Sequence, residues 1–194
     1  MAPRVWLGAY HCVLPVRARV AHTAPSPVTG SSSGFGRAMT EYALSKGDNV
    51  IATLRKPSDL ADLQQKFSVT QLLVVQLDVT DPKAILDAFS AGKEAFGCID
   101  IVFNNAGWSA AGEVEGTSDD VARKLFEVNF WGATNVSKEA IRFFREENPA
   151  GAGGRLIVVS SFVGIKPVPI GGYYSASKHG EPVDIWSLLS CSCT

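Results

Sequence analysis

Short apolar runs alternate with helix-like segments along this chain, and that alternation constrains the fold more than any other feature. Four runs that read as buried strands lie at residues 50–54, 72–77, 99–103 and 156–159. Helices are predicted between them: one ending near Gly47, one over 81–96, and a long one from Ser118 to about Glu147 with a bend at Gly132. Strands that are apolar on both faces belong to parallel sheets covered by helices. The sequence therefore predicts an α/β fold with a doubly wound parallel sheet.

The composition indicates one domain over residues 1–194. Of the 194 residues 46% are apolar and the net charge is −1, so the chain can bury a sizeable core and has no bias toward nucleic acid. Four cysteines are too few for a disulfide framework, which indicates a reducing compartment, the cytoplasm. No apolar run approaches the roughly 20 residues of a membrane span. We expect a small-molecule partner, with no metal site, no nucleic acid and no membrane span.

A glycine-rich turn, Thr29-Gly30-Ser31-Ser32-Ser33-Gly34-Phe35-Gly36, precedes the first predicted helix. In a doubly wound fold such a turn delivers a helix N-terminus toward the ligand, where free N–H groups and the helix dipole favour phosphate. The spacing is not G-x-G-x-x-G and lacks the Lys-Ser/Thr ending of a triphosphate-binding loop, so an ordinary Gly/Ser-rich loop stays an alternative. The residues expected to bind a dinucleotide here are Thr29, Gly30, Ser32, Ser33, Gly34, Phe35 and Gly36.

The residues after the run 50–54 indicate which dinucleotide is bound. An acid at this place would favour a free ribose 2′-hydroxyl, but the chain has Arg55 and Lys56 and no acid. Arginine can grip a 2′-phosphate with two parallel hydrogen bonds. We therefore expect NADP(H) rather than NAD(H), with solvated side chains after a strand as the alternative.

A tyrosine and a lysine lie four residues apart in Tyr174-Ser175-Ala176-Ser177-Lys178. Hydride transfer to or from a carbonyl needs a proton moved on its oxygen, and a phenol ordinarily has a pKa near 10, too high for a base at neutral pH. On a helix Lys178 faces the same side as Tyr174 and can stabilise the phenolate. Such a pair is also common by chance.

These motifs together resemble those of the classical short-chain dehydrogenase/reductase family. The resemblance spans residues 28–179 and includes Asn104-Asn105-Ala106-Gly107, Asn129 and Ser161. It implies a Rossmann-like dinucleotide-binding fold with Ser161, Tyr174 and Lys178 as the reacting group, and with Asn129 anchoring a water in a proton relay. The interval to Tyr174 favours Ser161 over Ser160.

The same resemblance implies further contacts with the cofactor. Lys178 would hold the nicotinamide ribose and Tyr174 would lie beside the nicotinamide. Asp78, with Val79 beside it, would lie near the adenine ring, although a plain loop or helix-capping role for Asp78 is as well supported. The segment from Asn104 to Gly107 would line the cofactor cleft, with Asn105, Ala106 and Gly107 in contact with the dinucleotide.

The function expected from these residues is NADP(H)-dependent interconversion of an alcohol and a ketone or aldehyde. The apolar stretch 163–172 favours an apolar substrate. A catalytically inactive nucleotide-binding or interaction protein, or a mis-assembled gene product of such an enzyme, is the alternative.

Two segments depart from the family pattern. Ala24-Pro25-Ser26-Pro27 precedes Val28, and proline weakens a central strand, so residues 8–27 are expected to be an insertion, with the missing half-strand at 4–7 or, in competition, at 16–21. Pro182 would end the helix after Lys178, which makes 180–194 a divergent tail. We expect a sheet that is incomplete at its C-terminal edge, with an unpaired strand there, and we doubt the family's usual homo-oligomer.

Overall fold

The structure, a computed structural model, describes residues 9–13 and 24–180. Its strands are β1 Ala9–Val13, β2 Ser26–Thr29, β3 Val50–Leu54, β4 Leu72–Gln76, β5 Ile101–Asn104 and β6 Arg155–Val159. Its helices are α1 Gly34–Ser45, α2 Ala61–Lys66, α3 Pro82–Phe96, α4 Asp119–Phe126 and α5 Ala133–Glu146, with short helical turns η1 Pro57–Leu60, η2 Glu127–Gly132 and η3 Phe162–Gly164.

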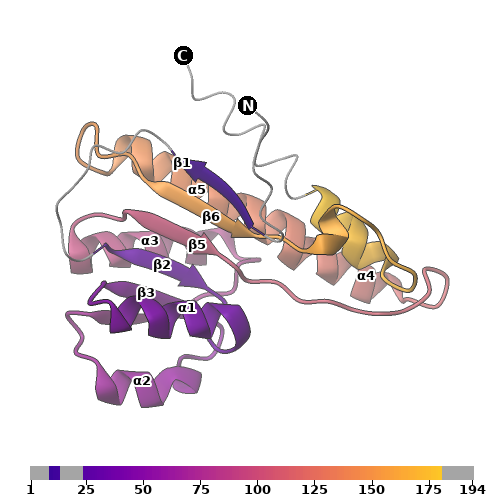
Figure 1. Cartoon of the computed structure of the whole chain (residues 1–194), viewed down its shortest axis with the longest axis horizontal. Helices are drawn as coiled ribbons and strands as arrows, with labels where there is room; N and C mark the ends of the chain where they lie inside the picture. The colour runs from indigo at the N-terminus through magenta and orange to yellow at the C-terminus, as the bar shows by residue number, and fades with distance from the viewer. Residues whose placement is uncertain (1–8, 14–23, 181–194) are drawn as a thin grey trace.

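The described strands form one sheet in the order β1-β6-β5-β2-β3-β4. Strands β2 to β6 are parallel to their neighbours, whereas β1 runs antiparallel along β6 (Figure 1). From β2 the chain builds outward through β3 and β4, then returns to build the other half from β5. The prediction of a doubly wound parallel sheet is confirmed. In such sheets ligands bind beyond the carboxyl ends of the strands, where the order reverses, which is here between β2 and β5.

Both faces of the sheet are covered, and β3 shows why its sequence is apolar throughout. Every residue of β3 is buried. Val50 and Ala52 pack with Leu44 of α1 and Leu63 of α2. Ile51, between them, joins the second cluster, which includes apolar side chains of α3 and α5. Successive side chains of a strand point to opposite faces of the sheet, and here helices cover both faces, so every residue of β3 is buried and the strand reads as a continuous apolar run.

The central strand β2 contains a proline. The Ser26 N–H donates to the carbonyl just before β3 at 3.0 Å, and successive residues of a strand direct their N–H groups to opposite neighbours. The nitrogens of Pro25 and Pro27 therefore both face β5, where β2 pairs through Val28 alone. The Pro25 carbonyl still accepts the Asp100 N–H at 3.0 Å. Placing the missing half-strand upstream was wrong, because the prolines face the side where the ladder is short.

The edge beyond β6 is paired, contrary to expectation. Ala9–Val13 form β1, whose five residues pair in register with β6. The expected unpaired edge strand is therefore corrected: an antiparallel neighbour from the N-terminal part of the chain supplies its ladder partners. Residues 4–7 and 16–21 lie outside the described residues. The interpretation of 8–27 as an insertion stays a prediction.

The long predicted helix from Ser118 is divided by a π-helical turn. Ser118 is the N-cap of α4, and α4 continues through η2, which is π-helical, into α5. Gly132 ends η2, so the predicted bend falls where the backbone changes its hydrogen-bond spacing. A π turn inside a helix often marks a functional site, and η2 carries Asn129.

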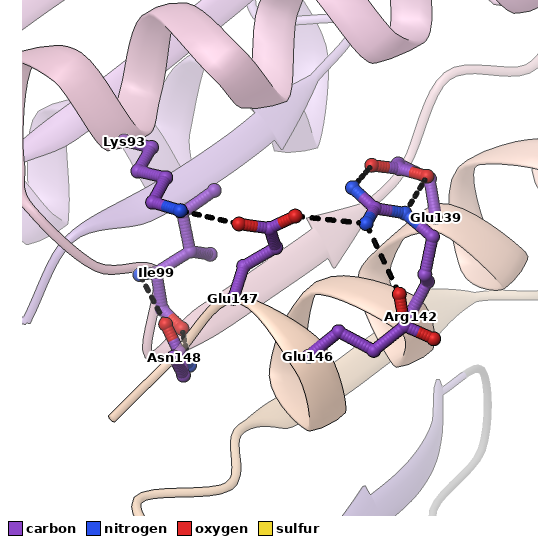
Figure 2. Close-up of polar contacts among 7 residues, drawn as sticks. All are labelled: Lys93, Ile99, Glu139, Arg142, Glu146, Glu147 and Asn148. Atoms are coloured by element: carbon purple, nitrogen blue, oxygen red, sulfur yellow. Dashed lines mark hydrogen bonds and ion pairs between the residues drawn. The ribbon is translucent and has the colours of Figure 1, made fainter. Parts of the chain in front are cut away.

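A polar cluster fixes the end of α5. Figure 2 shows Glu147 between Lys93 of α3 and Arg142 of α5. Arg142 also binds Glu139 at 2.7 Å. The neighbouring Asn148 accepts the Ile99 N–H at 3.1 Å and donates to the Ile99 carbonyl at 2.7 Å. These contacts hold α5, α3 and the approach to β5 together.

The described chain ends in a helical segment, residues 172–180. Tyr174 and Lys178 lie on it. The predicted interruption at Pro182 and the tail 181–194 lie outside the described residues. None of the helices in 24–180 is both long and apolar enough to cross a membrane.

Candidate active site

A cleft of about 1190 Å³ opens at the carboxyl ends of the parallel strands. The residues that follow each of the five strands contribute to its lining, as expected for a doubly wound sheet. Fourteen of the residues singled out in the sequence line it: Gly30, Ser32, Ser33, Gly34, Phe35, Arg55, Asp78, Val79, Asn105, Ala106, Gly107, Ser161, Tyr174 and Lys178. Thr29, Gly36 and Asn129 do not, and each has a supporting place instead.

The N-terminus of α1 opens on the cleft without a cap. Its N-cap residue, Ser33, makes no side-chain hydrogen bond to the helix, and the first turn contains no acid. By contrast, Asp81 caps α3 by accepting the N–H groups of Lys83 and Ala84. An uncapped helix start lined by Ser32, Ser33 and Gly34 leaves N–H donors and the positive end of the helix dipole for an anion. These residues fit the pyrophosphate of a dinucleotide.

Gly36 serves a close approach inside the protein. A Cβ at this position would collide with the carbonyl oxygen of Gly30 and would lie 2.7 Å from Nδ2 of Asn105. Gly34 has a different reason: its φ is +55° and a Cβ there would meet open space. Gly36 therefore lets helix α1 close on the turn, and Gly34 provides the left-handed backbone that turns into it.

Thr29 ties the glycine turn to the loop after β5. Its hydroxyl accepts the N–H groups of Asn105 and Ala106 at 2.8 and 2.9 Å, and its carbonyl accepts Nδ2 of Asn105 at 2.9 Å. Thr29 is 2% exposed. Its place is thus between the two halves of the sheet at the switch point, where it sets the width of the cleft. Asn104 was expected to line the cleft but instead donates to the Ala133 carbonyl of α5 at 2.8 Å.

Arg55 and Asp78 lie at the far end of the cleft, after β3 and β4. Oδ1 of Asp78 accepts the N–H and the hydroxyl of Thr80, at 3.0 and 2.8 Å. Burial acts to raise the pKa of Asp78, but those two hydrogen bonds and the charges of Arg55 and Lys124 lower it below its ordinary value. Asp78 is therefore a turn residue and also a charged group on the cleft wall, so both readings of it are retained.

Tyr174 and Lys178 face the cleft from the helical segment 172–180. Lys178 is only 5% exposed, and its ammonium donates to the Val159 carbonyl at 3.0 Å. A Cβ on Gly107 would lie 3.7 Å from Nζ of Lys178. The ammonium thus lies between the end of β6 and the loop after β5, next to Gly107.

The two serines after β6 have different surroundings. Ser161 is the N-cap of η3, and its hydroxyl accepts the Val163 N–H at 3.4 Å, a long contact. The Ser160 hydroxyl is buried and makes no hydrogen bond within the described residues; a Cβ on Gly164 would lie 2.9 Å from it. Both serines line the cleft, and the choice of Ser161 as the serine that contacts a ligand stays a prediction.

Asn129 is fully buried in the π turn η2. Its Oδ1 accepts the Trp108 N–H at 3.0 Å, and its Nδ2 donates to the Trp108 carbonyl at 2.8 Å and to the Ser177 hydroxyl at 3.2 Å. Both N–H groups of the side-chain amide thus already donate hydrogen bonds within the protein. A relay water beside Asn129 would therefore have to donate a hydrogen bond to an oxygen of this residue. The side chain connects the loop after β5 to the helix of Tyr174.

Among the residues that line the cleft but were not named as site residues from the sequence are Trp108 and Lys124. The indole N–H of Trp108 is buried and makes no hydrogen bond within the described residues. Lys124 on α4 adds a cation near Asp78. Trp108 directly follows the Asn104–Gly107 motif, which was an available signal, whereas Lys124 carried none. In residues 9–13 and 24–180, no three metal-ligating side chains gather into a cluster.

Known proteins share this arrangement. The family model for short chain dehydrogenases matches residues 27–182. An uncharacterized oxidoreductase of Schizosaccharomyces pombe is 41% identical over 151 residues, which are 78% of this chain and 49% of that protein. The chain thus spans about half the length of the relatives it matches.

Two solved structures are similar to the whole described fold. A short-chain dehydrogenase from Streptomyces avermitilis superposes with a TM-score of 0.74 at 34% identity, over 81% of this chain and 56% of that one. A short-chain dehydrogenase/reductase from Burkholderia phymatum, solved in complex with NAD, gives 0.75 at 27% identity, over 86% and 59%. Since the family model and these relatives match most of its length, the chain belongs to the short-chain dehydrogenase family.

Proposed function

We propose that the cleft binds NADP(H) and interconverts an alcohol and a ketone or aldehyde. One observation carries the proposal: Ser161, Tyr174 and the buried Lys178 line the same cleft as the uncapped N-terminus of α1. The first group supplies proton-transfer chemistry and the second an anion site, and both line one continuous cleft. A loop of glycines or a Tyr-Lys pair alone would not give that combination.

The chain's own residues account for the proton. When bound, the cofactor supplies or accepts the hydride. In the reducing direction the Ser161 hydroxyl donates a hydrogen bond to the carbonyl oxygen, and the Tyr174 phenol gives its proton to that oxygen. The Lys178 ammonium, held by the Val159 carbonyl, stabilises the phenolate that remains. Asn129 keeps Trp108 and Ser177 in place around this group.

Support for NADP(H) over NAD(H) comes from the end of β3. Arg55 lines the cleft, and the neighbouring residues Thr53, Leu54 and Lys56 include no acid. Lys124 adds a second cation to the lining of the cleft. A 2′-phosphate would gain from both cations, whereas the residues after β3 offer a ribose 2′-hydroxyl no carboxylate to accept its hydrogen bond. We further propose a cytoplasmic setting, because four cysteines in 194 residues are too few for a disulfide framework.

The substrate is proposed to be apolar. Phe162 and Ile165, on the segment after β6, are each more than half exposed. Exposed apolar side chains beside a cleft mark a surface for an apolar ligand.

The test compares the chain with its Tyr174→Phe variant. We expect NADPH to quench or enhance fluorescence equally in both proteins, while carbonyl reduction falls about 10²- to 10⁴-fold in the variant, the range for a lost general acid. Binding without Tyr174-dependent turnover would favour the alternative, an inactive nucleotide-binding protein. No binding of NADPH or NADH would refute both.

A further inference from the structure

The segment before the Tyr174 helix contains one backbone conformation that needs explaining. Ile170 has a φ of +55° and is the only non-glycine residue of the described chain with positive φ. A β-branched side chain disfavours this left-handed region strongly. Its side chain is 60% exposed, so packing of that side chain in the core does not hold the residue there.

Backbone contacts hold Ile170 instead. Its carbonyl accepts the Gly112 N–H at 2.7 Å, and Gly112 pairs with Gly171 in an isolated parallel bridge. Two residues on, a Cβ at Gly172 would lie 2.7 Å from Cγ2 of Val114. The loop after β5 and the segment after β6 therefore touch over 112–114 and 170–172. We call this contact the clasp.

The clasp lies at the start of the helix that carries Tyr174. The Gly171 carbonyl accepts the Ser175 N–H at 2.7 Å, and the Gly171 N–H donates to the Val168 carbonyl at 3.2 Å. Gly171 is thus the point where the turn ends and the helix begins. On its other side the loop after β5 carries Gly107 and Trp108, which line the cleft.

We propose that Ile170 is a positioning residue, whose left-handed backbone lets the clasp set the start of segment 172–180 and hence the place of the Tyr174 phenol in the cleft. Strained backbone persists where the surroundings over-determine it, and such positions gather at functional sites. Without the clasp the helix start could shift relative to Gly107 and Trp108, although Tyr174 and Lys178 would still share a face. The activity part of this proposal rests on the proposed function.

The experiment uses substitutions that separate backbone from side chain. Ile170→Asn and Ile170→Gly accept positive φ, so we expect kcat within about threefold of wild type. Ile170→Pro fixes φ near −65° and should lower kcat at least about tenfold, with the Kd for NADPH unchanged because the phosphates lie at α1. Gly112→Pro removes the N–H that donates to the Ile170 carbonyl and should lower kcat as much as Ile170→Pro does. Gly112→Ala keeps this N–H and should not lower kcat in this way.

Amide exchange gives a readout that needs no turnover. In wild type and Ile170→Asn the Gly112 and Ser175 amides should be protected, and in Ile170→Pro both should exchange faster. Loss of kcat in the Asn and Gly variants equal to that in the Pro variant would overturn the proposal, since the side chain would then be responsible. An unchanged exchange rate of the Ser175 amide in Ile170→Pro would also overturn the proposal. A wild type that binds NADPH without turnover would refute the proposed function, and the amides would still decide this inference.

Discussion

Among single residues, Arg55 is the one on which the proposed preference for NADP(H) depends. It lines the cleft, while its neighbour Lys56 does not. We expect Arg55→Ala to weaken NADPH binding about ten- to a hundredfold, because a hydrogen bond between charged partners contributes about 1.5–3 kcal/mol. NADH binding should change little, since it has no 2′-phosphate. Fluorescence titration of both dinucleotides measures this. Lys56→Ala is the matched control and should leave both affinities unchanged, and an equal loss for both dinucleotides in Arg55→Ala would contradict the assignment.

The glycines of the turn can be separated by the reason for each. Gly36→Ala forces a Cβ against the Gly30 carbonyl and the Asn105 amide, an overpacking that costs about 3 kcal/mol. Gly34→Ala meets no atom but must hold φ at +55°, which costs about 1 kcal/mol. Urea unfolding at pH 7 measures both free energies. A Gly34 variant as unstable as the Gly36 variant would show that sterics do not distinguish these positions.

Residue chemistry was readable from the sequence where it is local. The spacing of Tyr174 and Lys178 places both on one helix face, and the structure has both in the cleft. The sequence did not indicate that the Asn104 side chain points to α5 while the Asn105 side chain points to the glycine turn. Two adjacent asparagines at the end of a strand are chemically identical, and only the direction of each side chain separates their roles. Nor could the sequence show Lys124 near Asp78, since two elements far apart in sequence bring them together. The assigned roles of these residues stay predictions.

Among the elements, α3 and α5 are joined by a carboxylate whose protonation can be followed. Hydrogen bonds from Lys93 and Arg142 lower the pKa of Glu147. A depressed pKa stabilises the fold above the ordinary value, near 4.3, and that contribution is lost as the pH falls through the folded value. Glu147→Gln should therefore be less stable than wild type at pH 7, with the two stabilities converging toward pH 3. Urea unfolding across that range measures the difference.

Glu146 provides the control for this prediction. It lies one residue away and contacts Arg142 at 3.3 Å from an exposed position, so Glu146→Gln removes the same charge and leaves the bond between α3 and α5. We expect Glu146→Gln to lower the free energy of unfolding at pH 7 by less than Glu147→Gln does. A Glu147 variant whose stability runs parallel to wild type from pH 7 to pH 3 would show that the junction contributes nothing.

Elements with a local signal were predicted well. The helix predicted over 81–96 is α3, whose N-cap is Asp81 and whose C-cap is Gly97, because helix ends depend on neighbouring residues. The start of β2 was missed, since whether proline is tolerated depends on which neighbour its nitrogen faces, and that is set by pairing with β3 and β5. The sequence predicted η2 only as a bend at Gly132. A π turn differs from an α-helix in the spacing of its backbone hydrogen bonds, and that spacing requires no particular amino-acid composition.

For the whole molecule, the main departure from expectation is at the edge of the sheet. The sequence indicated an open edge beyond β6, and the structure places β1 there in antiparallel register. Pairing between segments more than a hundred residues apart is a competition among distant strands, which periodicity in one window cannot decide. The chain spans about half the length of the relatives it matches, so the activities of those relatives are only proposals for this chain.

Covering this edge should matter for solubility, because an exposed edge strand presents unpaired N–H and C=O groups to other chains. Proline at both His11 and Cys12 removes the N–H that faces β6, whichever of the two positions donates it. We expect this double variant to form larger species with rising concentration, measured by light scattering, whereas His11→Thr with Cys12→Val, which keeps the donors and strand propensity, should behave as wild type. Binding of NADPH should survive in the proline variant at low concentration, since the cleft is lined from β2 onward. Equal scattering from both variants would mean that β1 does not protect the edge of β6.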